Sequence, residues 1–71
     1  MASEWETLYL EALHEQDPEK VAEVCERARR AINDRLIELA AQKIVSETQR
    51  EQLFDALRRL LIHEHKVRFP N

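Results

Sequence analysis

The chain has 71 residues, of which 44% are hydrophobic and 35% charged, and its net charge is −3. This length allows one small domain with a modest core, whose thin margin of stability a partner subunit would increase. Its start lacks the pattern of a signal peptide, no apolar run is long enough to cross a membrane, and its one cysteine excludes an internal disulfide, so we expect a cytoplasmic protein.

The composition predicts helices throughout. Glycine is absent, and Glu, Leu, Ala and Arg, which are strong helix formers, dominate. β-Branched residues never alternate with polar ones over the length of a strand. We therefore predict an all-α fold in a single domain over residues 1–71, with helices at about 3–16, 18–43 and 47–66.

The first predicted helix is short. Ser3 and Glu6 have the spacing of a capping box at its start. An apolar stripe at helical spacing follows, formed by Trp5, Leu8, Tyr9, Ala12 and Leu13.

Asp17 and Pro18 mark the start of the second predicted helix, because Asp caps helices and Pro is tolerated in their first turn. The main apolar stripe of this helix consists of Val21, Val24, Cys25, Ala28, Ile32, Leu36 and Leu39. Residues 46–52 contain no apolar side chain, and Ser46 with Gln49 again has capping-box spacing. We predict a turn near 44–46 that makes an antiparallel hairpin. One continuous helix is the alternative, since neither Gly nor Pro enforces the break.

Charge is unevenly distributed along the chain. Residues 1–26 hold eight acids and one base, whereas residues 27–71 hold six acids and ten bases. A turn near residue 46 places residues whose numbers add up to about 93 at the same level of the hairpin. The acidic start of the second helix then lies beside the basic end of the third. Because the charges would be neutralised within the molecule, we do not expect a nucleic-acid partner. The lack of a long apolar run likewise predicts no membrane partner.

Apolar residues remain outside the predicted core. The first helix spans roughly 20 Å and the second nearly 40 Å, so the first covers the second only to about residue 31. Beyond that point the apolar arc widens. We predict that a homodimer buries this surface, as an apolar patch of this kind is typical of an interface. In the alternative, the first helix shifts to cover it in a monomer. The predicted interface comprises Ile37, Ala41, Ile44, Val45, Phe54 and Leu61.

Three polar or amphipathic residues are predicted to meet at one level. Arg29 and Glu64 project close to the apolar stripes of their helices, and the same level rule brings Trp5 beside Arg29. We predict a cluster with the guanidinium stacked on the indole and paired with the carboxylate. It would act as a clamp that fixes helix register, or alternatively as a small anion pocket.

From the cysteine, the histidines and the charged pairs we predict no catalytic, metal-binding or cofactor-binding residue. Cys25 lies within an apolar stripe, which favours a buried, inert thiol. His63 and His65 point to opposite sides of a helix, so they cannot hold one ion together, and His14 lacks a ligand at helical spacing. Glu–Arg pairs four residues apart are typical of a solvated helix face rather than a phosphate site.

The segment from Ile32 to Leu39 followed by Lys43 resembles the long first helix of all-helical chorismate mutases, which are dimers of three-helix chains. The resemblance implies binding of a dicarboxylate substrate. In this alignment Glu26 replaces the leading catalytic arginine, Lys43 the second arginine, and Phe54 a catalytic lysine.

The whole chain is also similar to short uncharacterised bacterial proteins, for which no activity is implied. The shared positions are Trp5, Leu8 and Tyr9, then Ala28, Arg29, Ala31, Ile32, Arg35, Leu36, Glu38 and Leu39, and finally Ala56, Leu57 and Leu60. The sequence as a whole favours a non-enzymatic, self-associating protein–protein interaction module. A chorismate-mutase-like enzyme and a nucleic-acid-associated regulator are the alternatives.

Overall fold

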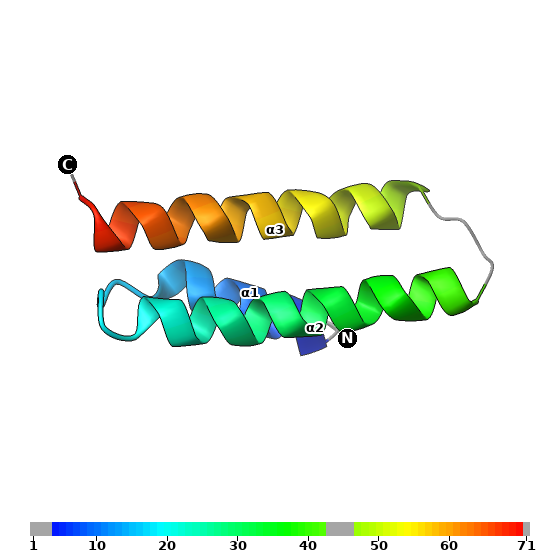
Figure 1. Cartoon of the computed structure of the whole chain (residues 1–71), viewed down its shortest axis with the longest axis horizontal. Coiled ribbons are helices and arrows are strands. Elements are labelled where there is room, and N and C mark those ends of the chain that lie inside the picture. Colours follow the sequence, from blue (N-terminus) through cyan, green and yellow to red (C-terminus); the bar gives the residue numbers. More distant parts are fainter. Residues whose placement is uncertain (1–3, 43–46, 71) are drawn as a thin grey trace.

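The computed structural model describes residues 4–42 and 47–70, and it contains three helices (Figure 1). They are α1 (Glu4–His14), α2 (Val21–Ala41) and α3 (Glu47–Arg68). No strand occurs among the described residues, so the predicted all-α class is confirmed. Because α2 and α3 run antiparallel and pack together, the alternative of one continuous helix is wrong.

The connection between α1 and α2 is longer than the sequence predicted. The Asp17 carbonyl accepts hydrogen bonds from the amides of Lys20 (3.0 Å) and Val21 (2.9 Å), and the Asp17 carboxylate accepts one from the Glu19 amide (2.9 Å). These bonds form a turn at 18–20, so α2 begins at Val21 instead of residue 18. The position of the boundary at Asp17 is confirmed.

The other helix ends also differ slightly from the prediction. The first helix ends at His14, two residues early, and α3 continues to Arg68, two residues late. At the end of α3 the Phe69 amide still donates to the His65 carbonyl (2.8 Å), as in a continuing helix.

The core lies along the line where the three helices meet. The largest fully buried side chains are Ile32, Leu53 and Leu60. Small residues lie between them on each helix, which lets the backbones approach closely. The full set of buried residues is Ala12, Val21, Cys25, Ala28, Ile32, Leu39, Leu53, Ala56 and Leu60.

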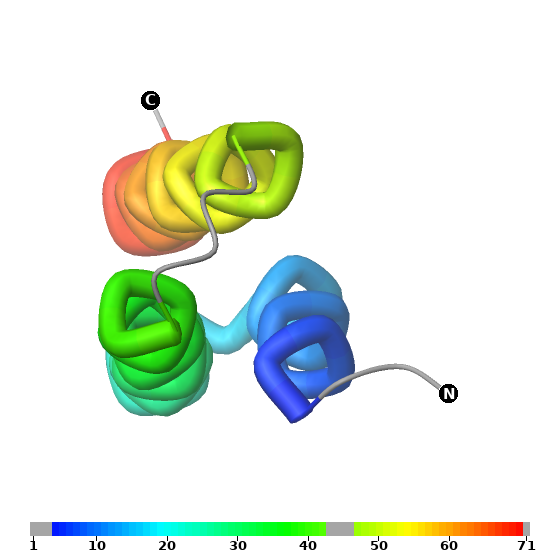
Figure 2. Tube along the Cα trace, turned by 90° about the vertical axis from the view of Figure 1, so that its right-hand side faces the viewer, coloured from blue at the N-terminus to red at the C-terminus, as the bar shows by residue number. Residues whose placement is uncertain are grey.

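The bundle is incomplete at one end. Viewed along the helices, the three elements occupy the corners of a triangle, with α2 beside both α1 and α3 (Figure 2). The first helix has 11 residues against 21 and 22 for the others, and it lies beside the end of the hairpin where α2 starts and α3 finishes (Figure 1). The molecule measures 42 × 21 × 17 Å, and within the described residues no helix lies against one long face of the hairpin.

Candidate functional site

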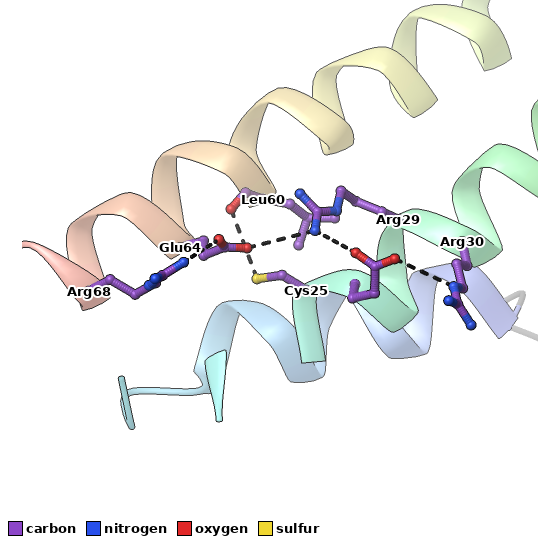
Figure 3. A network of polar contacts seen from close by, with 7 residues as sticks. Cys25, Arg29, Arg30, Leu60, Glu64 and Arg68 are labelled. Carbon is purple, nitrogen blue, oxygen red and sulfur yellow. Dashed lines mark hydrogen bonds and ion pairs between the residues drawn. The ribbon is translucent and has the colours of Figure 1, made fainter. Parts of the chain in front are cut away.

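A chain of ion pairs crosses from α3 to α2 (Figure 3). Arg29 Nη2 on α2 lies 4.0 Å from Glu64 Oε1 on α3. The other Glu64 oxygen lies 3.4 Å from Arg68 Nη1, and the same Arg29 nitrogen donates to Glu26 Oε2 at 2.7 Å. Glu26 also pairs with Arg30, whose Nε lies 3.5 Å from Glu26 Oε1. The network therefore joins the end of α3 to the first half of α2.

Glu64 is the most enclosed member of this network. Its side chain is 16% exposed, and its Oε1 atom is buried without a hydrogen bond among the described residues. The Arg29 charge at 4.0 Å is therefore the main compensation for this oxygen, since a buried carboxylate is unfavourable without an opposite charge. This geometry supports the function of a clamp between two helices.

Trp5 does not join the pair. The expected stacking of the Arg29 guanidinium on its indole is not observed among the described residues, and the ring contact of Trp5 is with Tyr9, at 6.2 Å between centroids. Trp5 instead lines a groove with Ala31 and Asp34, on the side of α2 that faces α1. Arg29 projects from the side of α2 that faces α3, so one residue cannot contact both partners.

The groove beside Trp5 was not predicted from the sequence. It has a volume of about 690 Å³ and is lined by all three helices, with Leu8 and Leu53 among its apolar residues. Its arginines are already paired: Arg27 with Glu23 at 2.8 Å, Arg30 with Glu26 and Arg35 with Glu38 at 3.0 Å. The pairing leaves no concentrated positive charge that would attract a phosphate or carboxylate ligand.

Cys25 lies beneath the ion-pair network (Figure 3). Its side chain is buried, and its Sγ donates to the Leu60 carbonyl at 3.9 Å. Burial raises the pKa of the thiol, the negative charge of Glu64 raises it further, and the Arg29 charge opposes them. A thiol held neutral and out of solvent is a poor nucleophile.

Two of the three histidines form hydrogen bonds with backbone carbonyls. His63 Nε2 donates to the Glu15 carbonyl at 2.9 Å and so ties α3 to the connection after α1. His14 Nδ1 donates to the Leu10 carbonyl at 2.8 Å. Within residues 4–42 and 47–70, no group of three or more His, Cys, Asp or Glu side chains is placed to hold a metal ion. The contact of His63 links residues 48 positions apart, and no sequence pattern signalled it.

The predicted interface residues lie at the surface. Ile37 is 67% exposed, Leu61 60% and Phe54 52%, and Ala41 is exposed as well. Ile44 and Val45 lie outside the described residues. Helical periodicity places Ile37 on the hairpin face away from α1, and Phe54 and Leu61, which are seven residues apart, on the same face of α3.

Comparison with known proteins finds no matching family model, curated protein or solved structure. The two resemblances seen in the sequence therefore stay predictions. No helix within the described residues combines the length and apolar character needed to span a membrane.

Proposed function

We propose that the chain is a non-enzymatic protein–protein interaction module that self-associates as a homodimer. The observation that carries this proposal is the row of large apolar side chains on the hairpin face away from α1, namely Ile37, Phe54 and Leu61. Each is more than half exposed in the single chain. Exposed apolar side chains gathered on one face are typical of an interface.

The surface area of the chain supports the same proposal. Its accessible surface is 5522 Å², whereas a compact monomer of its mass would expose roughly 4,700 Å². The difference is close to the roughly 800 Å² that each partner buries in a standard interface. The elongated chain therefore exposes more surface than a compact monomer of its mass, as expected of a chain with an uncovered face.

The charged residues favour a protein partner over a nucleic acid. Arg27, Arg30 and Arg35 each pair with a glutamate of α2, and Arg59 pairs with Asp55 of α3 at 2.9 Å. Binding to phosphates would require breaking such pairs and would be opposed by the acids beside them.

Analytical ultracentrifugation over a range of micromolar concentrations tests the proposal. We expect a dimer that is lost in the Leu61→Glu variant, because a carboxylate would be buried in the interface. Leu10→Glu is the matched control, since Leu10 is 52% exposed but lies on α1. A monomeric wild-type chain at high micromolar concentration, or equal effects of the two substitutions, would contradict the proposal.

A further inference from the structure

The outward side of the second half of α3 carries exposed basic and apolar side chains. They have the spacing of a helical stripe, which places them on one side of the helix. All of them are exposed. We call this set, which consists of Arg58, Ile62, His65, Lys66 and Phe69, the basic stripe.

The basic stripe lies opposite the residues with which α3 joins the core. Those core residues include Ala56 and Leu60, and α3 occupies one corner of the triangle of helices (Figure 2). The side opposite them therefore faces away from both α1 and α2. Phe69 follows the last residue of α3, but its amide donates to the His65 carbonyl at 2.8 Å, so Phe69 continues the helical turn.

The positive charges of the basic stripe are not neutralised within the described part of the chain. Within residues 4–42 and 47–70, neither Arg58 nor Lys66 forms an ion pair. The one acid in residues 56–70 is Glu64, which is turned toward α2 and is 16% exposed. Arg59 and Arg68 flank the stripe, although each has an acid four residues earlier.

Helix electrostatics account for only part of the basic stripe. A basic residue in the last turn of a helix interacts favourably with the helix dipole, which explains Lys66. The same effect gives no reason for Ile62 to be 46% exposed or for Phe69 to be 57% exposed. Large apolar side chains between unpaired bases favour a partner that is both apolar and anionic.

We propose that the basic stripe binds the surface of a lipid bilayer that contains anionic headgroups. Ile62 and Phe69 enter the boundary between headgroups and acyl chains, and the long side chains of Arg58 and Lys66 extend to the lipid phosphates. The sequence predicted no membrane partner because it has no apolar run long enough to span a bilayer. Attachment at the surface needs no such run. This binding goes beyond the proposed self-association and uses a different face.

The shape of this surface favours a bilayer over an acidic protein or a nucleic acid. The basic stripe forms the convex back of a single helix, whereas the groove beside Trp5 reaches α3 at Gln49 and Leu53. A bilayer deforms around a convex ridge, but a protein must supply a matching groove. The phosphates of a nucleic acid would contact the bases and leave Ile62 without an apolar partner.

The acidic residues of the chain limit the contact to the end of α3. Glu51 and Asp55 precede the basic stripe on the same side of the helix, so an anionic surface repels the first half of α3. The exposed acids of α1 lie at another corner of the triangle, and the short dimensions of the molecule, 21 and 17 Å, exceed the screening length of roughly 8 Å in physiological salt. The chain therefore meets the bilayer with the last turns of α3 tilted toward the surface.

Co-sedimentation with large unilamellar vesicles tests the proposal. The probes are vesicles of phosphatidylcholine alone and vesicles in which about 30% of the lipid is phosphatidylserine. We expect the wild-type chain to bind only the anionic vesicles, and to bind them less as the salt concentration increases. Equal binding to the two kinds of vesicle, or binding to neither, overturns the proposal.

The contribution of charge is tested by Arg58→Gln combined with Lys66→Gln. Each base near an anionic surface strengthens binding about fivefold, so we expect the double variant to bind about 25-fold more weakly. Arg27→Gln with Arg30→Gln is the control, because it makes the same change of net charge at exposed positions of α2. Equal losses from the two double variants overturn the proposal, since net charge alone would then explain the binding.

The contribution of the apolar side chains is tested by Phe69→Ala. We expect roughly tenfold weaker binding to the anionic vesicles, because the substitution removes most of an apolar side chain that leaves water on binding. Leu10→Ala is the control, since Leu10 is 52% exposed but lies on α1, and its binding should match that of the wild type. Equal effects of the two substitutions overturn the proposal.

Two further measurements separate the bilayer from other partners. Retention on duplex DNA or polyglutamate that depends on Arg58 and Lys66, without binding to vesicles, would assign the basic stripe to a nucleic acid or an acidic protein and overturn the proposal. In analytical ultracentrifugation, the variant with both bases replaced should sediment like the wild type. A change in its self-association would place the basic stripe in the dimer interface instead, whereas a monomeric wild type that binds anionic vesicles would overturn only the proposed function.

Discussion

The Arg29 guanidinium of α2 lies 4.0 Å from the Glu64 carboxylate of α3, and Cys25 is buried beneath the pair. Arg29 also donates to Glu26 at 2.7 Å, so one arginine joins its neighbour on α2 to an acid of α3 whose Oε1 atom accepts no hydrogen bond among the described residues. Such a pair fixes which turn of α3 lies beside which turn of α2. The pair stabilises the fold to the extent that the attraction between its charges exceeds the cost of removing them from water.

Removing one partner of this pair should destabilise the fold. We expect Arg29→Ala to lower the free energy of unfolding by about 1–3 kcal/mol, because the buried Glu64 oxygen loses its nearest opposite charge. Replacing both residues, as Arg29→Met with Glu64→Leu, should restore most of this loss. Urea unfolding of the Arg29→Met and Glu64→Leu single variants and of the double variant measures the coupling.

Arg27→Ala is the control for this cycle. Arg27 forms an exposed pair with Glu23 at 2.8 Å within one helix, and such pairs contribute roughly 0.5 kcal/mol or less. If the Arg29 and Arg27 variants lose equal stability, the clamp between α2 and α3 has no special role.

Glu26 should make the free energy of unfolding depend on pH in the acidic range. The hydrogen bond from Arg29 and its positive charge hold the pKa of the Glu26 carboxyl below its ordinary value, with a smaller contribution from Arg30. A lowered pKa in the folded chain stabilises the fold above the ordinary glutamate range, about pH 4.3, and this stabilisation is lost as pH falls.

Glu26→Gln should therefore lose less stability than the wild type between neutral pH and about pH 3. Thermal unfolding at several pH values measures the difference. Glu51→Gln removes one negative charge from an exposed position of α3 and serves as the control. A Glu26→Gln variant with the same acid sensitivity as the Glu51→Gln variant would contradict this assignment.

His63 should stabilise the contact between α3 and the connection that follows α1. Replacing it with alanine removes the hydrogen bond to the Glu15 carbonyl, and we expect a loss of about 0.5–1.5 kcal/mol in urea unfolding. His65→Ala is the matched control, because His65 is exposed and its ring lies beside Phe69 of the neighbouring turn, at 5.1 Å between ring centroids. Equal losses for the two variants would count against a role for His63 in joining the helices.

The sequence predicted relationships along the hairpin better than relationships across the bundle. The contact between Arg29 and Glu64 was predicted from one turn position, because two regular helices of known rise leave little freedom once the turn is placed. Trp5 could not be placed in the same way. The connection between His14 and Val21 is longer than one capped junction, and its length shifts α1 along α2. Which side of α2 the first helix occupies depends on packing, which no local pattern encodes.

The His63 contact and the groove beside Trp5 show the same limit. Both require three helices to be positioned in space, and neither leaves a spacing signal in the chain. Exposure of Ile37, Phe54 and Leu61 was expected because they lie outside the stripes that the hairpin can bury. Helical periodicity shows which apolar residues lie outside the core-facing stripe, whereas it does not show what covers them.

The Cys25 thiol should report on opening of the bundle. Because burial raises its pKa and excludes reagent, we expect negligible reaction with a chromogenic disulfide in the native protein at neutral pH and complete reaction in urea. The Ala40→Cys variant supplies an exposed thiol on the same helix and should show one fast-reacting group under native conditions.

At intermediate urea concentrations, the reaction rate of Cys25 should increase as transient separation of α2 from α3 becomes more frequent, since the sulfur contacts Leu60 of α3. Absorbance stopped-flow at increasing urea concentrations measures this rate. Reaction of native Cys25 as fast as that of the Ala40→Cys thiol would show that the α2–α3 seam is open to solvent, contrary to the packing described above.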